Sequence, residues 1–241
     1  MKSKLLILLF LLITHVGMAQ NAHFWDGIES FDGPTDENPV LAAQLDFYFD
    51  KLVAPLPDSI TMEIDRLVGR TSFNTDLRDF ILWHLLEKYR QPVFMAQDQV
   101  FVWLYDQYFS QLEIKDLSAT NLALISEKAE RLRRLALFCP APNIQLNDSV
   151  DLQSVESDYT VLFFYDHDCE VCQLEMQDLD SVCAEHPEIT AIKIDMNDDW
   201  EGLGEIYNAY DIETTPLIYI LDRDKRIIAK KIRSKQIPLI L

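Results

Sequence analysis

The chain has 241 residues, of which 49% are hydrophobic and 25% are charged, with six glycines and ten prolines. This composition excludes a disordered, collagen-like or coiled-coil protein, because each of those needs a far more skewed residue usage. The formal net charge is −19 at pH 7. We expect no nucleic acid partner, because so negative a chain repels nucleic acid as well as anionic lipid.

Residues 1–19 have the three-part layout of a secretory signal peptide, with two lysines, an apolar run over Leu5–Ile13 and a small-residue exit at Gly17–Ala19. The apolar run is far shorter than the roughly 20 residues that a membrane-spanning helix needs. Removal of this segment takes away two lysines and no acid, which makes the formal charge −21. We therefore expect an exported protein with no membrane span after signal removal.

Residues 20–138 show helical periodicity and contain no motif of known chemistry. His84 lies in an apolar stripe and is predicted to be a core histidine rather than a ligand. The segment is therefore predicted to be an all-helical domain. Its expected helices are Pro39–Val53, Asp58–Val68, Thr75–Arg90, Ala96–Leu112 and Ser118–Phe138.

After Cys139–Pro142 the pattern changes to short β-prone runs that alternate with helical ones. Thr160–Tyr165 is continuously apolar, as expected of a central strand covered on both faces. Residues 139–241 are therefore predicted to be an α/β domain whose last two strands form an antiparallel hairpin. Its expected elements are strands at Val150–Leu152, Thr160–Tyr165, Thr190–Asp195, Leu217–Leu221 and Ile227–Ile232, and helices at Cys169–Ala184 and Leu203–Ala209.

Two cysteines, Cys169 and Cys172, follow the central strand and begin the next helix. At a spacing of i and i+3 they face the same side and can form a disulfide with little strain. Free amides and the helix dipole stabilise a thiolate on the first cysteine. Cys169 is therefore the candidate nucleophile, and Cys172 is the candidate that resolves a mixed disulfide.

This strand, Cys-x-x-Cys and helix arrangement resembles the thioredoxin superfamily. Pro216, preceded by Thr214-Thr215, matches the family's cis-proline, which implies that Thr215 and Pro216 bind the substrate chain as an added strand. The opening Pro140–Ile144 resembles the exported TlpA-like thiol-disulfide oxidoreductases. The resemblance implies a central mixed sheet flanked by helices, protein thiol or disulfide substrates, and a membrane thiol transporter as electron donor.

The helical part resembles an uncharacterised domain that precedes thioredoxin-like domains in envelope proteins of Gram-negative bacteria. This resemblance brings no known activity. Together with the signal peptide, it implies the periplasm or cell envelope of a Gram-negative bacterium as the location.

Several residues depart from the family's pattern. Asp168 replaces the aromatic residue before the first cysteine, and Phe163 replaces the carboxylate or amide expected six residues before it. The acids around Cys169 oppose the helix dipole, so we expect a moderately perturbed thiol and a reducing couple. Residues 233–241 are too few for the usual closing helix, so we expect one face of the sheet to be thinly covered.

The two remaining cysteines have no motif of their own. Cys183 lies about 16 Å from Cys172 along the same predicted helix, too far for a disulfide, and is predicted to be a packed core thiol. Cys139 is either a spare thiol or a link to another chain. We expect no metal site, because a second ligand pair at zinc spacing is absent from the sequence, and no cofactor.

The leading hypothesis is an enzyme: an exported thiol-disulfide oxidoreductase, acting as a reductase, in which Cys169 attacks and Cys172 resolves. The alternative is a redox-inactive binding module of the cell envelope, in which the two cysteines form a structural disulfide. A third hypothesis, peroxide reduction, is weaker because Asp166 stands where the Thr-x-x-Cys signature of peroxiredoxins needs threonine.

Overall fold

The computed structural model describes residues 23–28, 31, 38–147, 149–197 and 203–241, so the expected signal peptide lies outside the described residues. The chain divides into two compact units. One contains the described residues up to Gln91 together with 103–118, and the other contains 92–102 and 119–241. The expected domain boundary between residues 138 and 139 stays a prediction. The last long helix before this boundary belongs to the same compact unit as the C-terminal segment.

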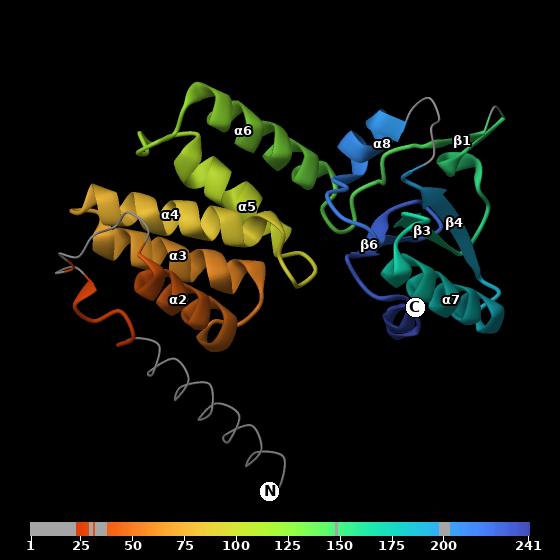
Figure 1. Ribbon diagram of the computed structural model, residues 1–241, viewed down its shortest axis with the longest axis horizontal. Helices are drawn as coiled ribbons and strands as arrows, with labels where there is room; N and C mark the ends of the chain where they lie inside the picture. The colour runs from red at the N-terminus through yellow and green to blue at the C-terminus, as the bar shows by residue number, and fades with distance from the viewer. Residues whose placement is uncertain (1–22, 29–30, 32–37, 148, 198–202) are drawn as a thin grey trace, which may run out of the picture. The chain divides into compact units, whose positions relative to one another are not determined.

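The described N-terminal part of the chain is helical, as the sequence predicts (Figure 1). Two of its helices continue into a short π-helical turn. No described helix is long and apolar enough to cross a membrane. The helices are α2 (Pro39–Phe47) with a π-turn at Tyr48–Leu52, α3 (Pro57–Thr71), α4 (Thr75–Arg90), α5 (Asp98–Leu104) with a π-turn at Tyr105–Phe109, and α6 (Ala119–Arg134).

Side chains cap and pin these helices. Asn38 and Asn74 cap α2 and α4, with each side-chain oxygen accepting a backbone amide of the first turn at 2.9 and 3.1 Å. The ring of Trp25 lies 5.2 Å from that of Tyr48, which fixes the chain entry on the helices. His84 is half-buried and bonds to Asp46 at 3.0 Å, so it is satisfied within the fold.

The C-terminal unit contains a four-stranded sheet with the order β4-β3-β5-β6. Strands β3 and β4 are parallel, whereas β5 is antiparallel to both β3 and β6. The expected central mixed sheet flanked by helices is therefore confirmed. Its elements are β1 (Gln145–Asn147), β2 (Val150–Asp151), β3 (Tyr159–Tyr165), α7 (Glu170–Glu185), β4 (Ile189–Asp195), α8 (Leu203–Tyr210), β5 (Leu217–Leu221) and β6 (Ile227–Lys230).

The central strand β3 is buried on both faces because its side chains alternate between two cores. Val161 and Phe163 pack with α7 on one face. Leu162 and Phe164 pack with α8 and the β1–β2 segment on the other. The strand therefore ends between two covered faces, and the chain leaves it directly into the two-cysteine turn.

Several local features differ from the sequence-based expectation. Helix α6 ends at Arg134 rather than Phe138, because the amide of Phe138 donates to Ile227 at the sheet edge. Residues Ser234–Leu239 form a 3₁₀ helix whose Ile237 is fully buried against α7, so the sheet face is covered and the expectation of thin cover is wrong. The short strand β1 was not predicted.

A buried ion pair joins α5 to the sheet inside the C-terminal unit. The Lys230 ammonium contacts the carboxylate of Asp98 and donates to the carbonyl of Leu135 at 2.6 Å. The side chains of Lys230 and Asp98 are only 1% and 2% exposed. A charge so deeply buried is tolerated only when it is paired, so the pair fixes α5 against β6.

We expect Lys230→Met to lower the free energy of unfolding by about 3–5 kcal/mol, because it leaves Asp98 buried without a counter-charge. The matched control is Arg223→Met, which removes an exposed pair with Asp158 and should cost less than about 1 kcal/mol. Urea unfolding of both variants measures the difference. Equal losses in the two variants would contradict the role given to the buried pair.

Candidate functional site

The two cysteines lie where the central strand passes into α7. Cys169 is the N-cap residue of that helix, and its Sγ accepts the backbone amide of Cys172 at 3.2 Å. Cys169 is half-buried, whereas Cys172, in the first turn, is fully buried. The arrangement therefore offers one accessible sulfur and one sheltered sulfur behind it.

The sheltered sulfur has a shifted acidity. Burial raises the pKa of Cys172, and its hydrogen bond with Cys169 raises it further. The backbone of Asp166 and the side chain of Thr215 act in the opposite direction, because each forms a hydrogen bond to the Cys172 sulfur. The raised pKa therefore favours the neutral thiol at Cys172.

The four residues predicted for the site meet at one end of the sheet. The peptide bond between Thr215 and Pro216 is cis, as the family resemblance implies, and β5 begins at the next residue. The Thr215 side chain forms a hydrogen bond with Cys172, and Cys169 is the N-cap residue three positions before Cys172. The structure thus brings Cys169, Cys172, Thr215 and Pro216 together, and their roles stay predictions.

The acidic loop before Cys169 is braced to the end of β4. The Nδ1 atom of His167 lies 2.8 Å from Oδ2 of Asp195, and Oδ1 of Asp166 accepts the side-chain amide of Asn197 at 2.6 Å. The hydrogen bond that His167 donates to the Asp195 carboxylate raises the pKa of His167, and the nearby Asp168 carboxylate adds to the shift. The loop is therefore held by two polar contacts from one neighbouring strand end.

The position six residues before Cys169 carries no proton-transfer group. Phe163 is fully buried there, and its ring stacks on that of Tyr165 with centroids 5.6 Å apart. The nearest buried acid along α7 is Glu175, which accepts the Ser234 amide at 2.9 Å and pairs with Arg233 at 2.9 Å. Burial would raise the pKa of Glu175, but these contacts outweigh it and the pKa lies below its ordinary value. Glu175 therefore stays ionised and anchors the chain end.

Sequence reasoning missed this anchor and a second one near Thr215. Lys128 of α6 pairs with Asp211 at 3.0 Å and with Glu213 at 2.5 Å, just before the cis peptide bond. A signal was present in both places, since Glu175 and Lys128 stand within apolar stripes of their helices, where a charged residue needs a buried partner. The identity of the partner could not be read from the sequence.

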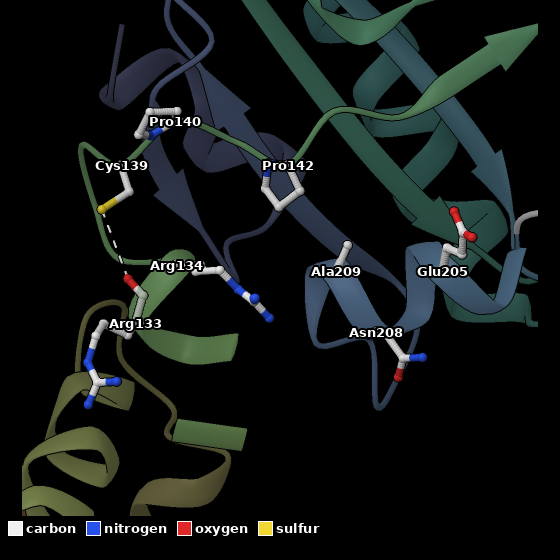
Figure 2. A pocket seen from close by; sticks show the side chains of 8 residues that line it. All are labelled: Arg133, Arg134, Cys139, Pro140, Pro142, Glu205, Asn208 and Ala209. Carbon is white, nitrogen blue, oxygen red and sulfur yellow. Dashed lines mark hydrogen bonds between the residues drawn. The ribbon is translucent and has the colours of Figure 1, made fainter. Parts of the chain in front are cut away.

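The other two cysteines lie outside this site. Cys183 is half-buried and packs against the core beneath α7, as expected. Cys139 lines a cavity of about 790 Å³, and its thiol faces the carbonyl oxygen of Arg133 (Figure 2). In the described part of the chain no group of three metal-ligating side chains occurs. The cavity is lined by Arg133, Arg134, Cys139, Pro140, Pro142, Glu205, Asn208 and Ala209.

In a variant with Cys139 and Cys183 replaced by serine, we expect iodoacetamide at pH 8 to alkylate Cys169 at least about tenfold faster than Cys172. The reason is the burial and raised pKa of Cys172. Mass spectrometry of time points gives both rates. The same variant with Cys169→Ser is the control, in which Cys172 should stay slow. A Cys172 rate equal to that of Cys169 would refute the assignment of the accessible sulfur.

His167 should titrate by NMR with a midpoint above its ordinary value of 6.5, because Asp195 stabilises the imidazolium. The pairing is fully present below the unfolded-state pKa and is lost as the pH rises through the raised folded-state pKa. Asp195→Asn should bring the midpoint down. A midpoint that Asp195→Asn leaves in place would show that Asp195 does not hold this charge.

Comparison with known proteins finds one family model that matches the C-terminal part. A sequence model of the AhpC/TSA family matches residues 139–230. A search of curated proteins found no match.

Among solved structures, a thioredoxin-like protein from Bacteroides caccae aligns at 14% identity with a TM-score of 0.70, over 90% of this chain and 89% of that one. At this identity the likeness shows the fold alone. The thioredoxin domain of a thiol-disulfide oxidoreductase from Bacteroides vulgatus aligns at 20% identity with a TM-score of 0.37, over 41% of this chain and 90% of that one. Residues 139–230 thus match the AhpC/TSA family model, and the chain has a thioredoxin-like fold preceded by a helical region.

Proposed function

We propose that the protein is an exported thiol-disulfide oxidoreductase that reduces disulfides in protein substrates. The observation that carries the proposal is the pairing of a half-exposed Cys169 at the start of α7 with a fully buried Cys172 in the next turn. The hydrogen bond from the Cys172 amide and the dipole of α7 both favour negative charge on the Cys169 sulfur. That sulfur is therefore suited to attack a disulfide.

In the proposed reaction the Cys169 thiolate attacks one sulfur of the substrate disulfide, forms a mixed disulfide and releases the other sulfur as a thiolate. Cys172 then loses its proton, which passes to a released thiolate, and attacks the Cys169 sulfur. The substrate leaves as one thiol and one thiolate, and the thiolate takes up a proton from water, equal to the one that Cys169 lost on ionising. The protein is left with a Cys169–Cys172 disulfide. Two electrons and two protons from a dithiol donor restore the starting form.

The position of Thr215 supports a role in substrate binding. Its side chain hydrogen-bonds to the Cys172 sulfur, so a peptide lying along Thr215 and Pro216 would pass close to the cysteine pair. A peptide held there as an added strand is bound through its backbone, which suits substrates of varied sequence. We propose Thr215 and Pro216 as the substrate-binding residues.

The proposed location is the periplasm or cell envelope of a Gram-negative bacterium, and its support is the signal-like pattern of residues 1–19. In an oxidising compartment a reductase needs a source of electrons. A membrane-embedded thiol transporter is the partner that we propose, because it can carry reducing equivalents from the cytosol to an exported dithiol.

Titration of the mature chain against glutathione, with Cys139 and Cys183 replaced by serine, should give a midpoint between about −180 and −270 mV. The reduced form should reduce insulin. Cys169→Ser should abolish this activity, and Cys172→Ser should accumulate the mixed disulfide with the substrate. A pair that stays oxidised throughout the titration would overturn the proposal and leave a binding module with a structural disulfide.

A further inference from the structure

A buried network from α6 holds the chain just before the cis peptide bond. The Lys128 ammonium donates to both carboxylate oxygens of Asp211, at 3.1 and 3.0 Å, and to Oε1 of Glu213 at 2.5 Å. Arg131, one turn further along α6, lies 3.6 Å from Asp211. One helix thus supplies two cations to two acids that precede Thr215.

Burial strengthens the ion pairs of this network and restricts each charge to its partner. The side chains of Lys128 and Asp211 are 9% and 2% exposed, so water competes poorly for either charge. A buried lysine and a buried aspartate must keep each other as partners, since either one alone carries a large desolvation cost. The path of the backbone at Asp211 is therefore tied to the position of α6.

The backbone itself needs such a restraint. Asp211 has a φ of +51°, a left-handed conformation that residues with a side chain seldom adopt. Upstream, the Tyr219 hydroxyl donates to the carbonyl of Tyr210 at 2.8 Å and fixes the end of α8. Downstream, the chain is fixed again where β5 begins at Leu217. Between these two fixed points, Lys128 holds the chain through its contacts with Asp211 and Glu213.

We propose that Lys128 is a positioning residue for the substrate-binding segment Thr215–Pro216. By holding Asp211 and Glu213, it fixes the direction in which the following residues cross in front of Cys172. The inference rests on the proposed function, because it assigns to Lys128 the geometry of that same site. A substrate that binds as an added strand needs a preformed strand to pair with. If the Thr215–Pro216 segment is loose, binding must first order it, and this lowers the affinity for the substrate.

This role separates two kinds of substrate. A protein disulfide uses the Thr215–Pro216 segment and should be affected when the segment loosens. A small disulfide such as oxidised glutathione needs only access to Cys169. Loss of the Lys128 contacts should therefore raise KM for insulin while leaving kcat and the reaction with oxidised glutathione unchanged.

The test compares Lys128→Met with Arg133→Met in the full mature chain. Arg133 lies on the same helix, but its partner Glu130 is exposed, so the control removes an equal charge without touching Asp211. We expect Lys128→Met to lower kcat/KM for insulin about tenfold through KM, and the control to stay within about twofold of the wild type. Amide hydrogen exchange over residues 211–215 should accelerate in Lys128→Met alone.

A second variant guards against simple unfolding. Lys128→Met with Asp211→Asn leaves no unpaired buried charge, and asparagine tolerates a positive φ. This double variant should fold and show the same rise in KM and the same faster exchange, whereas Lys128→Arg should restore part of the affinity.

Two results would overturn the inference: an unchanged KM for insulin in the folded double variant, or an equal loss of reactivity toward oxidised glutathione. If the wild type reduces no insulin, the proposed function fails. Amide hydrogen exchange then tests separately whether Lys128 orders the segment. Unchanged exchange over residues 211–215 would refute the positioning role, and faster exchange in the variant but not in the control would support it.

Discussion

Two lysines with almost no contact with water govern how the C-terminal unit is assembled. Lys230 on β6 pairs with Asp98 of α5, and Lys128 on α6 pairs with Asp211 after α8. Each ammonium lies in a low-dielectric interior, where leaving it unpaired is far more costly than at the surface. The helix that carries Asp98 is consequently bound to β6, and the helix that carries Lys128 to the segment after α8, by specific partners rather than by apolar contact alone.

The same constraint explains why the compact unit includes residues that precede the strands. Residues 92–102 and the whole of α6 group with the thioredoxin-like domain, although they belong to a helical stretch of the sequence. Apolar packing tolerates sliding and rotation of a helix, whereas an ion pair inside a core requires one register. The helical region therefore contributes structural parts to the domain that carries the cysteines.

Around the cysteines, the backbone arrangement matches the thioredoxin-like fold, but several side chains depart from the pattern expected there. The helix start, the buried second cysteine and the cis Thr215–Pro216 bond form this arrangement. The buried position that would hold a proton-transfer group is filled by the apolar ring of Phe163, and the buried acid Glu175 is occupied with the chain end. In the proposed reaction, proton movement to and from Cys172 therefore depends on solvent, on a released substrate thiolate or on groups brought by the partner.

Much of the fold could be read from local pattern. The span Thr75–Arg90 was predicted with its observed bounds, because Asn74 caps its start and its apolar residues keep a helical period. The strand at Leu217–Leu221 was also predicted with its observed bounds, since five consecutive apolar residues follow a proline. The turn that carries Cys169 and Cys172 was likewise visible, because a buried strand runs directly into it.

The sequence by itself determined the types of the main helices and strands and the cysteine turn, because these follow from periodicity, capping and spacing over a few residues. The mixed sheet was expected from the resemblance to the thioredoxin superfamily. Only the tertiary structure decided where α6 ends, how residues 234–239 cover a sheet face, and which acids face Lys128 and Lys230. Those outcomes depend on contacts between residues 58 to 132 positions apart in the chain. A charged residue in an apolar stripe indicates that a buried partner is needed. Which residue becomes that partner depends on how distant elements of the chain pack together.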